Sequence, residues 1–357
     1  MGKRSTEQFE SVCGLDLGDR KSQLCVLDRE SGDVLEETRL VTSELALRHR
    51  FAGVSPLRIA LEVGTHSPWI SRLLASLGHE VIVANARKLR LIYENRRKDD
   101  RVDAEYLARL ARVDPRLLSP VRHRGAASQA DLAVVRSRAV LVTSRTRLVT
   151  HCRGVVKSLG SRLPSCDARS FAAKASAALP EALRPALEPV IEEIARLTLA
   201  IGQMDKLIEH LAAERYPETA LLSRVRGVGS LTALTYVLTL EEAQRFGRSR
   251  TVGAYLGLVP ARADSGESRP QLRITKEGDR YLRTLLVQCG HYILGPFGED
   301  CELRQFGERL VERGGKAAKK RAAVAVARKL AVLLHHLWAS GEEYDPFHSS
   351  GSASRAA

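Results

Sequence analysis

The chain has 357 residues, of which 44% are hydrophobic, and this size allows about two domains with their own cores. Its formal net charge of +14 and pI near 9.8 favour a polyanionic partner. Because the six cysteines are scattered, no apolar run approaches the roughly 20 residues of a membrane span, and the N-terminal segment lacks a signal-peptide core, we expect a cytoplasmic protein without structural zinc, disulfides or membrane contact.

The first 112 residues are predicted to alternate between strands and helices. Short apolar runs separated by turn residues predict strands at 12–17, 22–28 and 34–40. The elements that follow are a helix at 43–52, a strand at 58–62, a helix at 67–77, a strand at 80–84, and helices at 86–94 and 100–112. This order is typical of the ribonuclease H-like fold, an α/β fold in which helices flank a mixed sheet.

Residues 126–215 predict two long helices joined by a connector rich in alanine, serine and proline at 160–185. The first helix covers 127–158, and the second carries apolar residues at alternating spacings of four and three, as a coiled-coil seam does. The seam residues are Val190, Ile194, Leu197, Ile201, Met204, Ile208 and Leu211. Two interpretations stay open: the helices pack on each other within one chain, or they form a dimerisation arm.

The composition changes at about residue 220, where a mostly helical C-terminal part is expected. The turn at Gly227 and Gly229 between two predicted helices matches the helix-hairpin-helix pattern, whose turn amides bind a backbone phosphate. The alternative is a plain tight turn between helices. A last long helix is expected at 316–339, followed by a disordered tail. The predicted domains are therefore 1–125, 126–215 and 216–345, with the tail at 346–357.

Four carboxylates in the first third of the chain are predicted to converge. Asp16 lies in one apolar strand and Glu62 ends another, while Asp100 and Asp103 share one face of a helix. Acid groups in core strands need a positive partner, and hard divalent cations prefer oxygen ligands. Two such ions about 3.5–4 Å apart can activate a nucleophile and stabilise a leaving oxygen. This pattern predicts a Mg²⁺ (or Mn²⁺) centre that cuts nucleic acid.

The acid residues also have competing interpretations. Asp100 and Asp103 suit a solvated helix start, where the helix dipole favours acids, and Asp99 points off their shared face. The segment 14–18 is similar to the phosphate-binding turn of actin-like ATPases, but further nucleotide-binding glycine loops are not found downstream. A non-enzymatic nucleic-acid scaffold is a third possibility.

Several cations are expected to contact phosphate, because lysine and arginine outnumber acids around them. They are Arg96, Arg97, Lys98, Arg262, Arg269, Lys276, Arg280 and Arg283. Ser265 lies among them in a polar loop. From the residues alone it is an ordinary loop serine, since no adjacent histidine supplies a base.

Together these motifs resemble the DEDD-type insertion-sequence transposases, whose better-studied members are bridge-RNA-guided serine recombinases. The resemblance covers nearly the whole chain. It rests on the acid motifs at 14–16, 60–62 and 98–104 and on the C-terminal motifs at 227–229, 255–260, 265–266 and 276–283. Asp99 departs from the small polar residue that the family often has at this position.

The resemblance implies a RuvC-like N-terminal domain whose four carboxylates bind magnesium. It also implies that Ser265 attacks DNA to form a covalent phosphoserine link. The expected partners are donor and target DNA, a structured bridge RNA from the element, and further copies of the chain in a homodimer or homotetramer with shared active sites. The alternative within the enzyme class is a junction resolvase or nuclease that uses metal-activated water and in which Ser265 is structural.

Overall fold

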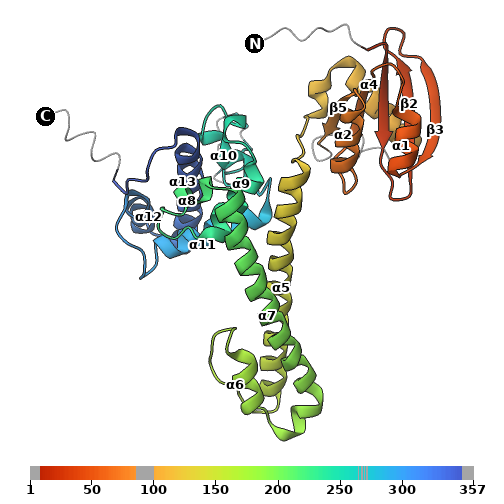
Figure 1. Cartoon of the computed structure of the whole chain (residues 1–357). Coiled ribbons are helices and arrows are strands. Elements are labelled where there is room, and N and C mark those ends of the chain that lie inside the picture. The colour runs from red at the N-terminus through yellow and green to blue at the C-terminus, as the bar shows by residue number, and fades with distance from the viewer. Residues whose placement is uncertain are drawn as a thin grey trace, which may run out of the picture. The chain divides into compact units, whose positions relative to one another are not determined.

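The structure is a computed structural model that describes residues 9–85, 100–263, 265, 266, 268, 270 and 272–347 (Figure 1). The chain divides into two compact units, Met1–Ala126 and Ala127–Ala357. The helix expected at 86–94 and the last ten residues of the expected tail lie outside the described residues.

The first unit contains a five-stranded mixed sheet. Its strands are β1 (Ser11–Asp16), β2 (Lys21–Asp28), β3 (Val34–Val41), β4 (Arg58–Glu62) and β5 (Glu80–Ala84), in the order β3-β2-β1-β4-β5. The first three strands pair antiparallel, and β4 pairs parallel with both β1 and β5. The mixed α/β class predicted from the sequence is confirmed, and this order is consistent with a ribonuclease H-like domain.

Helices cover both faces of this sheet, so its central strands are buried on both sides. On one face, α1 (Glu44–Phe51) and α2 (Ser67–Ser76) pack through Phe51 and Ile70 against Leu15 and Leu61. On the other face lie α4 (Asp100–Val113) and the short 3-10 helix η2 (Pro115–Leu118). Strands buried on both faces read as nearly continuous apolar runs, which is why their positions could be predicted.

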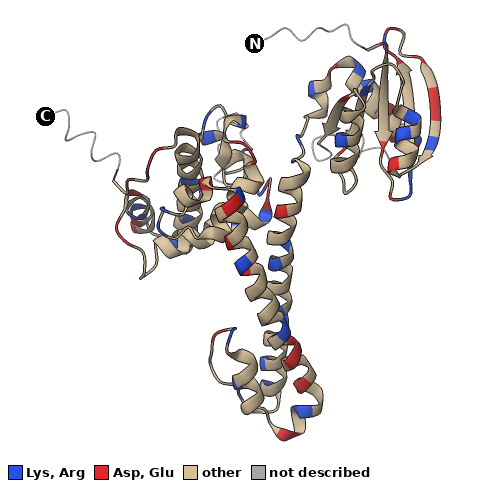
Figure 2. Cartoon of the chain, viewed as in Figure 1, with Lys and Arg blue, Asp and Glu red and all other residues tan. Residues whose placement is uncertain are grey.

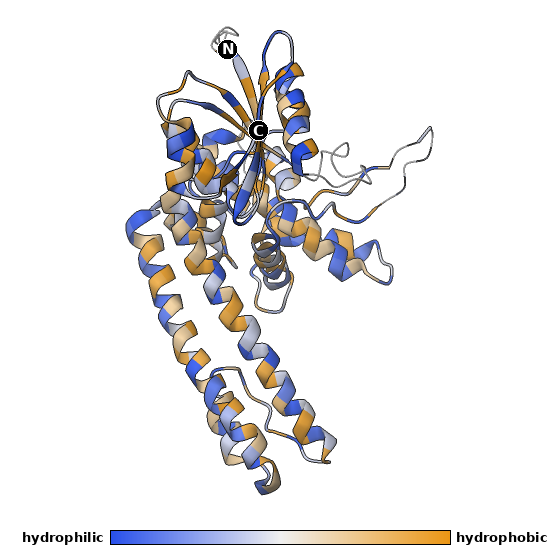
Figure 3. Cartoon of the chain, turned by 90° about the vertical axis from the view of Figure 1, so that its right-hand side faces the viewer, coloured by the Kyte–Doolittle hydropathy of each residue, from blue (hydrophilic) through white to orange (hydrophobic). Residues whose placement is uncertain are grey.

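The second unit begins with a pair of long helices that lie side by side (Figure 1). They are α5 (Ala126–Ser158) and α7 (Arg184–Arg215). Apolar clusters join them at both ends, around Val156 and Ile194 at one end and around Val135 and Ile208 at the other. Between the clusters, the Arg138 Nε donates to Asp205 at 2.6 Å. Basic and acidic residues both occur along the two helices (Figure 2), with hydrophobic residues recurring between them (Figure 3).

The apolar seam predicted on α7 therefore packs within its own chain. Ile194, Ile201, Ile208 and Leu211 are buried. The structure differs from the prediction in the connector, which contains α6 (Phe171–Ala177) and the 3-10 turn η3 (Glu181–Leu183). This segment is ordered because Phe171 is buried against the α5–α7 pair. A dimerisation role for these helices stays a prediction.

The rest of the second unit is helical and packs around α9 (Ser230–Leu240), of which every residue from Thr232 onward is buried. Around it lie α8 (Glu218–Leu222), η4 (Ala243–Arg245), α10 (Arg250–Tyr255), α11 (Arg280–Ile293), α12 (Glu302–Glu312) and α13 (Ala318–Ser340). The expectation of a helix at 316–339 agrees with α13, whereas α11 and α12 were not anticipated.

Among the described residues, α13 alone is long and apolar enough to cross a membrane by length and composition. No membrane-spanning segment is expected from the sequence alone. Half of its most apolar window is buried inside the unit, and Val326, Leu330 and Leu334 belong to the helical core. These contacts are those of a core helix.

Gly14 allows a test of the packing between α4 and β1. A Cβ atom at this position would lie 1.8 Å from the carbonyl oxygen of Ala104 and 2.7 Å from the backbone nitrogen of Ala108. Gly14→Ala should therefore lower the free energy of unfolding of the first unit by roughly 1–3 kcal/mol, as overpacking of a close-packed core does. Urea unfolding followed by Trp69 fluorescence, in a Trp338→Phe background, measures this change.

The matched control is Gly154→Ala, because an added Cβ at this helical position meets no atom within 4 Å. It should leave the Trp69 transition in place and stabilise α5 by up to about 1 kcal/mol. Equal effects of the two substitutions would contradict the close approach of α4 to β1.

Candidate active site

The strand register places Asp16 and Glu62 on the same face of the sheet. Leu15 of β1 lies opposite Leu61 of β4 in the parallel pairing, and both leucines belong to the core under α1 and α2. Side chains alternate between the faces of a strand. The next residue of each strand, Asp16 and Glu62, therefore points to the other face, which α4 covers.

The first turn of α4 brings two more carboxylates to that face. Gly14, two residues before Asp16, lies against Ala104, the neighbour of Asp103. The pKa of Asp16 is raised to about 6, chiefly by burial and in addition by the negative charges of Asp100, Asp103 and Glu62. This mutual repulsion requires the carboxylates to lie near one another, so the structure brings together the four acids that the sequence singled out.

The acids do not form a tight cluster. Within the part of the chain that the structure describes, no three Asp, Glu, His or Cys side chains are already arranged around one point as metal ligands are. Asp100 is largely exposed and accepts a hydrogen bond from Arg39 Nη2 at 3.3 Å. Four carboxylates from β1, β4 and α4 nevertheless form a donor set of the kind that fits Mg²⁺ or Mn²⁺, since both prefer oxygen ligands.

Two polar residues on the same face were missed by the sequence analysis. Gln23 of β2 lies directly opposite Asp16, and Arg39 of β3 lies opposite Gln23. The Gln23 side chain is 5% exposed although it is polar. Together they extend the row of acids with an amide and a cation. A glutamine inside an otherwise apolar strand was the available sequence signal, and it is the same signal that identified Asp16.

Ser265 lies in the second unit, at the tip of a β-ribbon. We call the described residues between 257 and 278 the serine ribbon, with legs at 257–263 and 272–278. Its two legs pair antiparallel: the Ala261 amide donates to the Arg273 carbonyl, and the Thr275 amide donates to the Val259 carbonyl, each at 2.9 Å. At the tip, Ser265 and Ser268 exchange backbone hydrogen bonds of 3.2 and 3.0 Å. The Ser265 side chain is exposed, as a group that meets a macromolecular substrate has to be.

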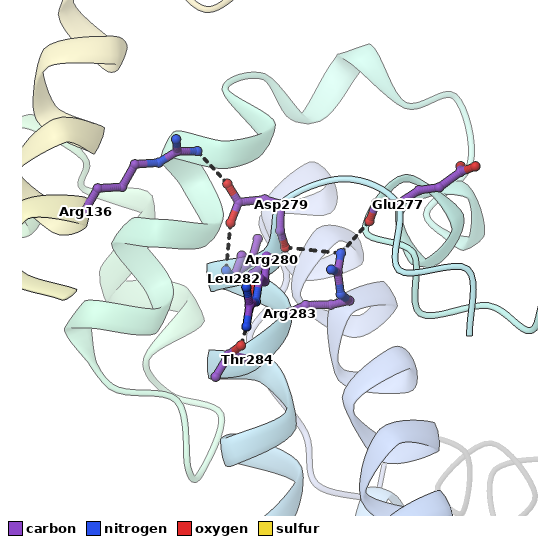
Figure 4. Close-up of polar contacts among 7 residues, drawn as sticks. All are labelled: Arg136, Glu277, Asp279, Arg280, Leu282, Arg283 and Thr284. Atoms are coloured by element: carbon purple, nitrogen blue, oxygen red, sulfur yellow. Dashed lines mark hydrogen bonds and ion pairs between the residues drawn. The ribbon is translucent and has the colours of Figure 1, made fainter. Parts of the chain in front are cut away.

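The cations predicted to contact phosphate have different surroundings. Arg262, Lys276 and Arg280 are exposed on the serine ribbon or just after it. Arg283 is 9% exposed, and its guanidinium donates to backbone carbonyls (Figure 4). Arg96, Arg97, Lys98 and Arg269 lie outside the described residues, as does Asp99. The prediction that these cations bind nucleic acid stays a prediction, and the geometry of Arg283 favours a different role.

The turn at Gly227 and Gly229 connects α8 to α9. Gly227 has a φ of +88°, and a Cβ there would lie 2.8 Å from the ring of Tyr292. Gly229 is the N-cap of α9 and offers no side chain to the first amides of that helix, while the buried Val228 anchors the turn in the core. Amides without a side-chain cap at a helix start suit a phosphate oxygen, and the phosphate contact at this turn stays a prediction.

Comparisons with known proteins match both units. A model of the transposase family IS116/IS110/IS902 matches residues 219–294, and a DEDD transposase model of the IS110 type matches residues 13–160. The chain is 26% identical over 354 residues to the transposase for insertion sequence element IS1111A of Coxiella burnetii, covering 96% of this chain and 93% of that protein. It is 27% identical to the transposase for insertion sequence element IS1328 of Yersinia enterocolitica, covering 78% and 82%.

A divalent cation should stabilise the first unit through Asp16, Glu62, Asp100 and Asp103, which we call the acid face. Binding to the native state raises the melting temperature by mass action, so millimolar MgCl₂ or MnCl₂ should raise the melting temperature of the wild type. Asp16→Asn and Glu62→Gln should lose most of this rise. Asp33→Asn, an exposed change in the turn between β2 and β3, is the control and should keep it. A full rise in all three variants would show that the cation binds elsewhere.

The raised pKa of Asp16 predicts a pH-dependent effect of its removal. Because the native pKa of about 6 lies above the ordinary value of 3.8, the native state binds this proton more tightly than the unfolded chain does. Ionising Asp16 between about pH 4 and pH 6 therefore costs stability. In EDTA, Asp16→Asn should melt above the wild type at pH 8, and the difference should shrink as the pH falls through 6 towards 4.

Adding Mg²⁺ should reverse the order of the two melting temperatures. With excess Mg²⁺ at pH 8, the wild type should melt above Asp16→Asn, since the ionised carboxylate then has a cation partner. A melting difference that is independent of pH would contradict the electrostatic coupling of the acid face.

Proposed function

We propose that the chain, which matches models of the IS110/IS116 family of insertion-sequence transposases at residues 13–160 and 219–294, cuts and rejoins DNA with two sets of groups, the four carboxylates of the acid face and the hydroxyl of Ser265. The observation that carries the proposal is the shared face of Asp16 and Glu62 under α4, which collects oxygen donors from three elements. Its substrates are donor and target DNA.

The acid face would hold Mg²⁺ or Mn²⁺ through Asp16, Glu62, Asp100 and Asp103. When bound, such an ion supplies positive charge for the oxygens of a reacting phosphodiester. The side chains themselves fix where that charge stands, since Asp16 and Glu62 extend from paired strands and Asp103 from a helix packed on them. Arg39, at the edge of this row, is placed to contact a neighbouring phosphate.

Ser265 would act as the nucleophile. Its Oγ forms a bond to phosphorus while a bond from phosphorus to a deoxyribose oxygen breaks. The hydroxyl proton leaves to a base, and the released deoxyribose oxygen takes up a proton. Reversal with the hydroxyl of another strand restores a phosphodiester and frees the serine, so rejoining needs no external energy source. The exposed tip of the serine ribbon supports this assignment, because it leaves Oγ accessible to a duplex.

Phosphate contacts outside the acid face are proposed for exposed cations near the serine, namely Arg262, Lys276 and Arg280. Contacts to phosphate position DNA without reading its sequence. We assign the choice of site to an RNA that pairs with donor and target DNA. This step rests on the family resemblance, as does assembly into dimers or tetramers through the α5–α7 pair, with the acids of one copy and the serine of another acting on the same phosphodiester.

A metal-dependent nuclease or junction resolvase is the second candidate. The observation in its favour is that the acid face is complete within the first unit and needs no residue of the second. In that function, water attacks the phosphodiester and Ser265 has no chemical role.

Ser265→Ala separates the two candidates. Purified protein with the element's DNA and its RNA should form a covalent protein–DNA adduct, visible by denaturing electrophoresis, and Ser265→Ala should abolish it. Asp16→Asn should reduce strand cleavage by roughly 100-fold or more, because preorganised charge at the reacting phosphate is lost. Ser268→Ala, in the same turn, is the matched control and should keep the adduct. Normal cleavage by Ser265→Ala without any adduct would favour the nuclease.

A further inference from the structure

The base of the serine ribbon is built from two backbone segments in direct contact. Gly257 has a φ of +65° and Gly278 a φ of +71°. A Cβ on Gly257 would lie 2.3 Å from the Glu277 nitrogen, and a Cβ on Gly278 would lie 2.1 Å from the Tyr255 carbonyl oxygen. The two legs therefore leave the helical core through one narrow junction, and whatever fixes this junction also fixes the direction of the ribbon.

One buried arginine crosses this junction. The Nη1 of Arg283 donates to the carbonyl of Leu256 at 3.0 Å, just before the first leg. The same nitrogen donates to the carbonyl of Glu277, at the end of the second leg, and to that of Asp279, just after it (Figure 4). Arg283 is 9% exposed, and its Nη1 already donates to these carbonyls, so the side chain serves the fold at this junction. A planar group with several donors suits such a bridge between two segments.

A second contact ties the same junction to α5. Asp279 is the N-cap of α11, where one carboxylate oxygen accepts from the Leu282 amide at 2.8 Å. Its other oxygen accepts from the guanidinium of Arg136 on α5 at 2.7 Å (Figure 4). The Asp279 side chain is 9% exposed. The carboxylate therefore has one partner in its own helix and one in α5.

We infer that Arg283, together with the Arg136–Asp279 ion pair, positions the Ser265 hydroxyl for reaction by fixing the base of the serine ribbon. Arg283 joins the two legs, and the ion pair of Arg136 with Asp279 links α5 to the segment that follows them. We call them positioning residues, because the contacts described above join them to the base of the ribbon and they would act on Ser265 through it. The inference rests on the proposed function of Ser265 as the nucleophile.

Hydrogen exchange of the full-length protein tests the positioning role without any ligand. In Arg283→Ala, amides in 257–263 and 272–278 should exchange at least about tenfold faster, since local opening sets exchange, while α9 and α13 keep their protection. Arg283→Lys retains donors that can reach the carbonyls and should restore part of the protection. Arg136→Gln removes only the partly exposed ion pair, and it should give a smaller increase confined to the second leg and the first turn of α11.

Matched controls remove similar groups elsewhere on the same helices. Gln288→Ala changes an exposed residue of α11, and Arg147→Ala removes a charge from an exposed position of α5. Both should leave exchange in the serine ribbon unchanged. Exchange that stays at the wild-type rate in the ribbon of Arg283→Ala overturns the inference, and so does exchange that rises equally throughout the second unit.

Activity is then measured by excision of the native element, carried on a plasmid with its own flanking DNA and scored by PCR across the junction. Arg283→Ala should lower excision by roughly 100-fold, the loss that a misplacement of about 1 Å can cause, with partial recovery in Arg283→Lys. Excision at the wild-type level in Arg283→Ala overturns the positioning role. Normal excision in Ser265→Ala overturns the proposed nucleophile instead, and the exchange data distinguish the two failures.

Discussion

The contact of α4 with β1 at Gly14 is the constraint on which the acid face depends. The helix can approach the sheet this closely because Gly14 has no side chain and because Ala104 and Ala108 are small. Asp103 precedes Ala104, so the same contact carries it towards Asp16. With a larger residue at position 14, the helix would stand farther away and its acids would interact more weakly with those of the strands. The pKa of Asp16 is raised by its burial and by the charges of the neighbouring acids, and both depend on how closely α4 packs on the sheet.

The second unit uses the same kind of constraint at the base of the serine ribbon. Gly257 and Gly278 bring two backbone segments into contact, and Arg283 donates hydrogen bonds to backbone carbonyls on both sides of that junction. The two units differ in the kind of element that carries the candidate site residues. Asp16 and Glu62 extend from paired strands with core on both faces, whereas Ser265 stands at the end of a ribbon whose regular pairing is short. This difference would suit the proposed function, in which the four acids hold a metal ion at a fixed place and Ser265 reaches out to DNA.

Many of the arginines in this basic chain serve the fold rather than a polyanion. Arg283 and Arg304 each donate to three backbone carbonyls near helix ends. Arg112 donates to the carbonyls of Arg29 and Glu30 in the turn after β2. A guanidinium can satisfy several carbonyls at once and stays charged when buried. The net charge of +14 therefore overstates the number of cations that face nucleic acid, and exposed residues such as Arg262 and Arg280 carry more of the argument for DNA contact.

The sequence alone predicted the succession of strands and helices in the first unit, the two long helices and the candidate acids, because apolar periodicity is local and an acid inside an apolar strand stands out. It could not show that Asp16 and Glu62 share a face, since that follows from the pairing of β1 with β4 across intervening residues. Nor could it show that Gln23 and Arg39 lie beside Asp16, since that follows from the pairing of β1 with β2 and of β2 with β3. The surroundings of Arg283 could not be predicted either, because the sequence does not distinguish an arginine that donates to backbone carbonyls from one that contacts phosphate. Only tertiary structure, which decides burial and long-range register, separates them.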